Sequence, residues 1–347
     1  MLLKIILIFS FFLSLDAKDE TKSNDAVVFM YHRFGEVKYP STNITLKQFQ
    51  FQLDYLEQNN YNVIHLSKLL NLIKHQKHIP PKTVSLSIDD AYLSVFTKAY
   101  PMLKQKGFEF SVFVNTNIID NKSKSCISWE QMRLMQKNGA EFANHSLTHP
   151  YLLMQKNETK ELWKNRVNDE VQKAQKRLQK ELGENTNKNP KLFSYPFGEY
   201  DAQTIKLLKN LGYVGITQTS GTVGLDSDLM LVRRFPMAEA YASEEGFVTK
   251  LNTVEMPIES ISPNESIIKN QNPPKLSIKL KKPLKNLQCF ISSGEHIKIR
   301  WISQTEFEII GSKPIKQRRL KYTCTAPAPD AKWYWFSHLW INKYYKY

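Results

Sequence analysis

The sequence contains little cysteine and little glycine. Its 347 residues include three Cys and 12 Gly, which excludes a disulfide-rich scaffold and a collagen-like chain. Hydrophobic residues make up 41% and charged residues 23% of the chain. This ordinary balance excludes disorder across the whole chain and allows a sizeable core. There is no internal repeat and no low-complexity block, and the length favours two domains.

Long hydrophobic runs are absent after the N-terminus. The one apolar run, residues 5–15, follows a single Lys and precedes Asp16-Ala17. It is short for a bilayer span but typical of a secretory signal, so we expect residues 1–17 to be a signal peptide. An uncleaved N-terminal membrane anchor is the alternative. The expected protein is exported, periplasmic or extracellular, with no transmembrane span in the mature chain.

Export would carry the few cysteines into an oxidising compartment, where disulfides form. Cys289 and Cys324 both lie on strand-like runs near the C-terminus and are the natural pair. Cys126 is then left as a free structural thiol.

Acidic residues are scarce relative to basic ones. The chain has 48 Lys and Arg against 33 Asp and Glu, a net charge of +15, and residues 262–347 alone contribute 16 against 5. A basic C-terminal segment indicates contact with an anionic envelope surface, although a solvated Lys-rich surface explains it equally well. The export signal and the lack of a nucleic-acid-binding motif argue against nucleic acid as a partner.

Residues 26–250 alternate strand-like apolar runs with helical patterns. Such alternation predicts an α/β fold with a parallel sheet, and about seven strand–helix units predict a (β/α) barrel, closed or distorted. The strand-like runs cover residues 27–32, 62–66, 83–88, 110–115, 141–145, 191–196 and 213–218.

A change of composition after this region predicts a second domain. Residues 251–274 are polar and rich in Pro and Asn, as expected for a linker. Residues 275–347 contain short runs in which apolar and polar residues alternate with the period of two that marks half-buried strands. We expect a small all-β, sandwich-like accessory domain there.

Three segments at the carboxyl ends of predicted strands contain the residue types of a metal site. In barrels and open α/β sheets this edge is where sites form. Two imidazoles and one carboxylate leave metal positions open for water and substrate, and a second carboxylate is free to act as a base. Each segment alone is explained as well by a helix cap, a polar loop or a turn, but their order and placement together favour a site. The segments are Asp89-Asp90, His145 with His149, and Tyr195-Pro196-Phe197-Gly198.

These motifs resemble those of the polysaccharide deacetylase family (carbohydrate esterase family 4, the NodB homology domain), over about residues 27–235. The chain is similar in particular to exported poly-N-acetylglucosamine deacetylases. The resemblance implies that Asp90, His145 and His149 bind a divalent metal, Zn²⁺ ahead of Mn²⁺, Co²⁺ or Ni²⁺. It implies that Asp89 is the general base that takes a proton from the attacking water. The metal and a backbone N–H near Phe197 would hold the oxyanion.

The chain departs from the family pattern at several positions. Ala91 follows the Asp pair where many members have Gly, and Ser194 stands where many have the Arg that pairs with the catalytic Asp. Arg233 or Arg234 is expected to replace that arginine. No Leu-x-His motif follows to supply a general acid, so His32 on the first strand is assigned that role, with a structural buried histidine as the alternative.

The expected enzyme is a hydrolase of carbon–nitrogen bonds other than peptide bonds. It would remove N-acetyl groups from an N-acetylhexosamine polymer, an exopolysaccharide or a cell-wall glycan, and release acetate. Tyr92 and Trp129 are candidates to line a sugar groove together with the turn at residues 195–198, although packing explains Trp129 at least as well. The alternatives are a glycan de-O-acetylase and a catalytically silent glycan-binding protein.

Overall fold

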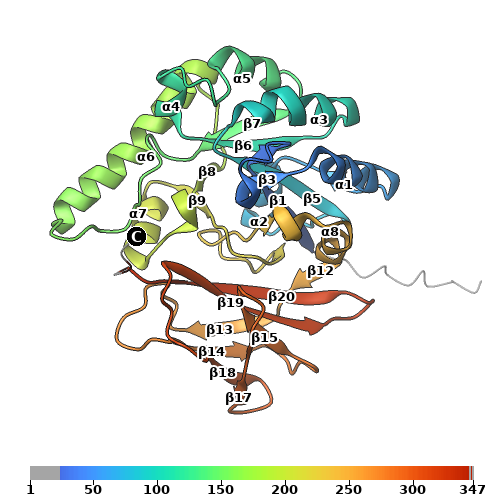
Figure 1. Cartoon of the computed structure of the whole chain (residues 1–347), viewed down its shortest axis with the longest axis vertical. Helices are drawn as coiled ribbons and strands as arrows, with labels where there is room; N and C mark the ends of the chain where they lie inside the picture. The colour runs from blue at the N-terminus through green and yellow to red at the C-terminus, as the bar shows by residue number, and fades with distance from the viewer. Residues whose placement is uncertain (1–23, 344, 346–347) are drawn as a thin grey trace, which may run out of the picture.

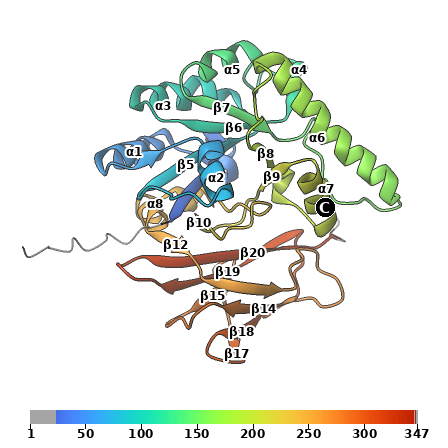
Figure 2. The same cartoon turned by 180° about the vertical axis from the view of Figure 1, so that it is seen from behind.

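The computed structural model describes residues 24–343 and 345. The expected signal peptide lies outside these residues. The chain forms an N-terminal α/β domain and a C-terminal β domain that lie directly against each other (Figures 1 and 2). No helix in the described part of the chain is long and apolar enough to cross a bilayer.

A curled, mainly parallel sheet forms the centre of the N-terminal domain. Its main path runs β10-β1-β5-β6-β7-β8-β9, with β4 beside β5 and β11 beside β1. The pairs on this path are parallel except for β1 with β10. This confirms the predicted barrel of about seven strands, in an open and distorted form. The strands are β1 (Asp25–Tyr31), β4 (Asn62–Val63), β5 (Thr83–Asp89), β6 (Phe110–Val114), β7 (Ala140–Asn144), β8 (Lys191–Ser194), β9 (Tyr213–Ile216), β10 (Val223–Gly224) and β11 (Phe235–Pro236), with a small pair β2 (Arg33–Phe34) and β3 (Asn43–Ile44) beyond β1.

Helices cover the outer face of this sheet. Helix α1 begins at a capping box in which Thr45 accepts from the Gln48 N–H, and it buries Phe49 and Leu53 against the sheet. Burial of such a side chain contributes about 1.5–3 kcal/mol, so the apolar stripe fixes which face of the helix points inward. The helices are α1 (Leu46–Gln58), α2 (Leu66–Lys74), α3 (Tyr100–Lys106), α4 (Thr116–Asp120), α5 (Trp129–Gln136), α6 (Lys160–Leu182), α7 (Ala202–Asn210) and α8 (Glu244–Leu251).

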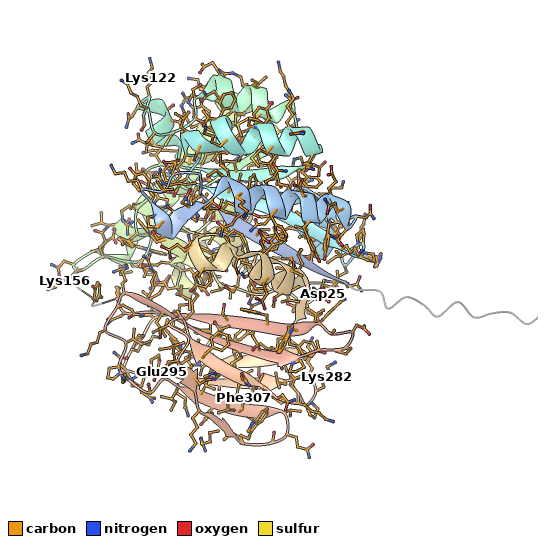
Figure 3. All side chains as sticks on the ribbon, turned by 45° about the vertical axis from the view of Figure 1, so that its right-hand side comes forward. Asp25, Lys122, Lys156, Lys282, Glu295 and Phe307 are labelled. Carbon is orange, nitrogen blue, oxygen red and sulfur yellow. A yellow bond between two sulfur atoms is a disulfide. The ribbon has the colours of Figure 1, made fainter. Side chains whose placement is uncertain are left out.

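The C-terminal domain consists of two sheets packed face to face, as the sequence predicts. Phe307, at the centre of this domain in Figure 3, is fully buried between them. A disulfide joins Cys289 to Cys324, the expected pair, and Cys126 is buried and free. One sheet runs β12 (Thr253–Glu255), β20 (Trp333–Ile341), β19 (Arg319–Pro327), β15 (Gln288–Ile291), β16 (His296–Ile297), and the other runs β13 (Ile258–Ser262), β14 (Lys275–Leu280), β18 (Glu306–Ile310), β17 (Ile299–Trp301).

The segment expected to be a linker is partly built into this domain. Strands β12 and β13 both lie within residues 251–274, and each forms the edge of one of the two sheets. Pro and Asn mark the turns of this segment, but the short strands between those turns are stabilised by pairing with residues far along the chain. The amino-acid composition of this segment therefore indicates its turns but not its two short strands.

The two domains are joined by polar contacts along β19 and β20, the strands nearest the barrel in Figures 1 and 2. Arg318 binds Glu199 through two hydrogen bonds of 2.7 Å, and the Glu199 side chain is fully buried. Lys321 donates to the carbonyl of Gln218 at 3.0 Å, and Ser337 donates to the carbonyl of Ser220. These contacts place the first residues of β19 beside the turn that follows β8.

Candidate active site

The three sequence motifs meet at the carboxyl edge of the parallel sheet. Asp89 is the last residue of β5, and the loops after β7 and β8 carry the other two motifs. Each loop turns through a residue in the left-handed region, with φ of 71° at Asp90, 58° at His149 and 59° at Phe197. This backbone conformation costs a non-glycine residue conformational free energy, and such strain is concentrated at functional sites. Ala91 also lies in this region, with φ of 51°, a conformation that glycine adopts without steric cost.

Asp90, His145 and His149 form a group that fits a divalent cation. One ligand atom from each lies within 4.8 Å of the others. The Nε2 atoms of His145 and His149 lie 3.5 Å and 3.6 Å from Oδ1 of Asp90. The Nδ1 atom of His145 is hydrogen-bonded to the carbonyl of Ser194 at 2.8 Å, which leaves Nε2 as the metal-binding nitrogen. Two imidazoles and a carboxylate are a donor set suited to zinc and leave coordination positions open.

A glutamate of helix α6 fixes the loop between the two histidines. Glu170 accepts hydrogen bonds from the N–H groups of Leu147 and Thr148 and from the Thr148 hydroxyl. The Ser146 hydroxyl accepts from the N–H of His149. Glu170 could not be predicted as part of the site, because nothing in the sequence links a residue of a long charged helix to a loop 22 residues away.

Asp89 is fully buried and is bound by Arg234. Nη1 and Nη2 of Arg234 each donate to one carboxylate oxygen at 2.8 Å. The other three N–H groups donate to the hydroxyls of Ser87 and Ser194 and to the carbonyl of Thr217. All five donors of the guanidinium are therefore used, which a fully buried arginine requires.

This contact decides between the two adjacent arginines. Arg234 contacts both Asp89 and Ser194, whereas the guanidinium of Arg233 lies 4.9 Å from the ring centre of Phe336 in the C-terminal domain. Arg233, also named as a catalytic candidate from the sequence, therefore makes no described contact with Asp89. Successive residues of an extended segment point to opposite sides, so only one of the pair can face the barrel.

Electrostatics keep the Asp89 carboxylate ionised. Burial alone raises its pKa, but the charge of Arg234, with His145 and His32 nearby, outweighs burial and holds the pKa well below the usual range. Asp89 is therefore ionised at neutral pH, which is the form in which a carboxylate can accept a proton.

His32 lies at the end of β1 beside this carboxylate. Its Nε2 is 4.0 Å from Oδ2 of Asp89, and 14% of its side chain is exposed. Burial lowers the pKa of His32, although Asp89 and Asp90 act in the opposite direction. The imidazole therefore lies just beyond hydrogen-bond distance from the carboxylate and lines the groove described below.

An open groove of about 630 Å³ passes over the site. Phe197 lies beside the metal-binding group, with its ring centre 4.5 Å from that of His149. Tyr92 lines the same groove beneath the guanidinium of Arg33. Most other lining side chains are neutral and polar, which suits sugar hydroxyl and amide groups. They are Thr42, Asn115, Asn117, Asn121, Thr148 and Gln218, together with Ile118 and Arg319.

Four residues expected to bind substrate do not line this groove. Trp129 is 7% exposed, packs in the core and donates to Asp120, so it supports the helix rather than the groove. Tyr195 is fully buried and donates to the carbonyl of Met230. Pro196 and Gly198 are buried in the turn itself. Of the four-residue motif, only the Phe197 side chain reaches the groove.

The histidine environment predicts how metal binding depends on pH. Burial, with the neighbouring His145, lowers the pKa of His149 to about 4. A protonated imidazole cannot bind a cation, so a lowered pKa extends metal binding to lower pH. We expect Zn²⁺ stoichiometry after equilibrium dialysis to be unchanged from pH 7.5 to 5.5 and to fall as the pH approaches 4. Loss of metal with a midpoint near 6.5, the ordinary histidine value, would contradict this description of the site.

The fold and the motifs agree with comparisons to known proteins. Residues 76–216 match the family model described as polysaccharide deacetylase. The chain carries a polysaccharide deacetylase domain. A poly-beta-1,6-N-acetyl-D-glucosamine N-deacetylase of Staphylococcus aureus (strain MSSA476) is 24% identical to it over 209 residues, which are 55% of this chain and 71% of that protein.

Solved structures share the fold of the deacetylase domain. A Streptococcus pyogenes deacetylase in complex with acetate superposes with a TM-score of 0.58 at 21% identity, covering 65% of this chain and 98% of that chain. IcaB from Ammonifex degensii gives a TM-score of 0.52 at 22% identity, covering 65% of this chain and 97% of that chain. In both cases the shared part leaves about a third of this chain unmatched.

Proposed function

We propose that the chain is an exported, metal-dependent polysaccharide N-deacetylase that removes acetyl groups from an N-acetylhexosamine polymer. The observation that carries the proposal is one arrangement: the Asp90–His145–His149 group lies next in the chain to a buried, arginine-bound Asp89, and Asp90 and His149 line an open groove. The Staphylococcus aureus relative, named for its action on poly-beta-1,6-N-acetyl-D-glucosamine, makes that polymer the first candidate substrate.

Each residue of the site has a separate role in the proposed hydrolysis of an acetamide. Asp90, His145 and His149 would hold the cation, which when bound supplies Lewis-acid activation of water and of the acetamide carbonyl. Asp89 takes a proton from the water as its oxygen attacks the carbonyl carbon. The N–H of Phe197 is assigned to the developing oxyanion. His32, in its protonated form, gives a proton to the amine nitrogen as the C–N bond breaks, and acetate and a free amine are released. Burial disfavours that form, whereas the neighbouring carboxylates of Asp89 and Asp90 favour it.

Export is supported by two independent features. The N-terminal apolar run has the length of a signal peptide, and the disulfide between Cys289 and Cys324 is of a kind found mainly outside the cytosol. The basic C-terminal domain would then face envelope material, where an anionic surface is the proposed partner.

The role of His32 separates an N-deacetylase from a de-O-acetylase. An amine leaving group needs a proton more than an alkoxide on a sugar does, so His32→Ala should lower acetate release from β-1,6-linked N-acetylglucosamine oligomers about 10²-fold or more. Release from an O-acetylated glycan should fall far less. The control is His78→Ala, which removes an exposed histidine that hydrogen-bonds Asn24 away from the groove.

Two results would overturn the proposal in different ways. Release from the O-acetylated glycan alone, with no effect of His32→Ala, would indicate a de-O-acetylase. Tight binding of the oligomers with no acetate release from either substrate would indicate a glycan-binding protein.

A further inference from the structure

One residue of the C-terminal domain reaches the candidate active site. Arg319, the first residue of β19, lines the groove together with His149 and Phe197. Its Nη1 donates to the carbonyl of Phe197 at 3.2 Å, and its guanidinium carbon lies 5.6 Å from the centre of the Phe197 ring. The same ring lies 4.5 Å from the ring of His149. A single aromatic side chain therefore separates Arg319 from the metal-binding group.

Arg319 carries a charge that its surroundings do not neutralise. The nearest carboxylate, Glu199, is bound through both oxygens by Arg318 at 2.7 Å and lies 3.4 Å from Arg319. Lys321 adds a third cation close by, with its ammonium group on the carbonyl of Gln218, another groove residue. The pKa of Lys321 is lowered to about 8, by burial and then by the charge of Arg319. Arg318 and Arg319 thus share one carboxylate at this end of the groove, and Lys321 is a third cation with no carboxylate among its described contacts.

Part of the Arg319 guanidinium remains available to a ligand. Both of its described hydrogen bonds, to Phe197 and to Glu199, use Nη1. Its side chain is 36% exposed. Among the described residues, Nη2 and Nε therefore have no protein acceptor, and they require one from water or from a bound sugar.

The proposed reaction changes the charge of the group that this cation meets from neutral to positive. An acetylated hexosamine offers a neutral acetamide whose carbonyl oxygen accepts hydrogen bonds, and the deacetylated unit carries an ammonium group instead. Because the Phe197 ring lies between Arg319 and the metal-binding group, a sugar next to the reacting unit in this groove would lie within reach of Arg319. A guanidinium binds a carbonyl oxygen there and repels an ammonium group.

We propose that Arg319 is a specificity-determining residue that requires an acetylated neighbour beside the sugar being deacetylated. This inference rests on the proposed function and adds a substrate rule to it. The enzyme would remove acetyl groups at spaced positions along the polymer and would slow down where the neighbour on the Arg319 side is already a free amine. The C-terminal domain would thereby determine which sugar units of the product polymer carry free amines.

The test uses the full chain and a β-1,6-linked N-acetylglucosamine hexamer. Products are sequenced by mass spectrometry, and the rate of the first deacetylation is compared with the rate at sites adjacent to a free amine. We expect adjacent sites to react about tenfold more slowly or worse in the wild-type protein, a modest value for like charges at a partly solvated site. Arg319→Gln should bring the two rates close together, and Arg319→Lys should keep most of the difference.

A matched control removes a cation of the same domain away from the groove. Arg300 is 68% exposed and pairs with Glu308 on β18, so Arg300→Gln should leave the product pattern unchanged. Equal adjacent and spaced rates in the wild-type protein, or an Arg319→Gln pattern identical to the wild type, would overturn the proposal. A purely structural role of Arg319 would lower every rate in parallel and leave their ratio unchanged.

A binding measurement separates this inference from the proposed function. Calorimetry with the Asp89→Asn protein compares the hexamer with the same hexamer carrying one free amine. Weaker binding of the amine form, relieved by adding Arg319→Gln, supports the inference whether or not the wild-type chain releases acetate. Equal affinities would contradict it, while absent turnover alone would refute only the catalytic proposal.

Discussion

Asp89→Asn is expected to lower acetate release about 10³-fold while the metal remains bound. Asp89 is the base of the proposed reaction, and an amide of the same shape keeps one of the two oxygen acceptors that Arg234 uses but cannot take a proton at neutral pH. Asp89 is not one of the three residues whose ligand atoms cluster. Acetate release from N-acetylglucosamine oligomers and metal content by atomic emission spectroscopy measure the two effects on the same sample.

The adjacent carboxylate provides the matched comparison. Asp90→Asn should lose both metal and activity, because Asp90 supplies the only carboxylate oxygen in the described metal-binding group. If Asp89→Asn also lost the metal, or kept more than about a tenth of the activity, the division of roles between the two carboxylates would be wrong.

Arg234→Met is expected to lower the free energy of unfolding by about 3–5 kcal/mol, because it leaves Asp89 as a buried and unpaired charge. Both side chains of this pair are fully buried. Activity should fall as well, because without Arg234 the burial of Asp89 raises its pKa and favours the protonated carboxyl, which cannot accept a proton from water. Urea unfolding, followed by circular dichroism, measures the stability, and acetate release measures the second effect.

The double variant Asp89→Asn/Arg234→Met distinguishes charge from packing. With no carboxylate left unpaired, the double variant should recover a large part of the lost stability but none of the activity. Arg233→Met is the control and should cost far less, since that side chain makes no described contact with Asp89. Additive losses in the double variant would show that Arg234 stabilises the fold through packing alone.

The sequence allowed the barrel, the β domain and the three motif segments to be predicted, for a physical reason. Alternating strands and helices dictate a parallel sheet, and the carboxyl ends of its strands necessarily share one edge. The four polar residues of the site lie at or just after such strand ends, so the alternation of strands and helices already predicted that they come together. They are Asp89, Asp90, His145 and His149.

The side chains that support the site were harder to predict. Whether Arg233 or Arg234 enters the barrel depends on the twist and register of a short irregular segment, and the twist and register cannot be predicted from the sequence. Aromatic residues near a motif are equally uninformative, because Trp129 and Tyr195 face the core while Phe197 and Tyr92 face the groove. The inward or outward direction of each ring is set by packing.

Arg319 had no sequence signal at all. The excess positive charge of residues 262–347 is visible in the composition. The position of Arg319 beside Phe197, however, results from the packing of the C-terminal domain on the barrel, where Arg318 binds Glu199. Contacts between residues more than a hundred positions apart belong to domain packing, which local pattern does not determine.

The most direct test of the account is a titration of the metal-free chain with Zn²⁺ while acetate release from N-acetylglucosamine oligomers is measured. A site built by Asp90, His145 and His149 should give a rate that rises linearly and stops rising at one equivalent, and a chelator should reverse it. The same titration of Asp90→Asn should remain flat. A rate that does not depend on metal, or one equivalent of bound Zn²⁺ without acetate release, would contradict the central claim.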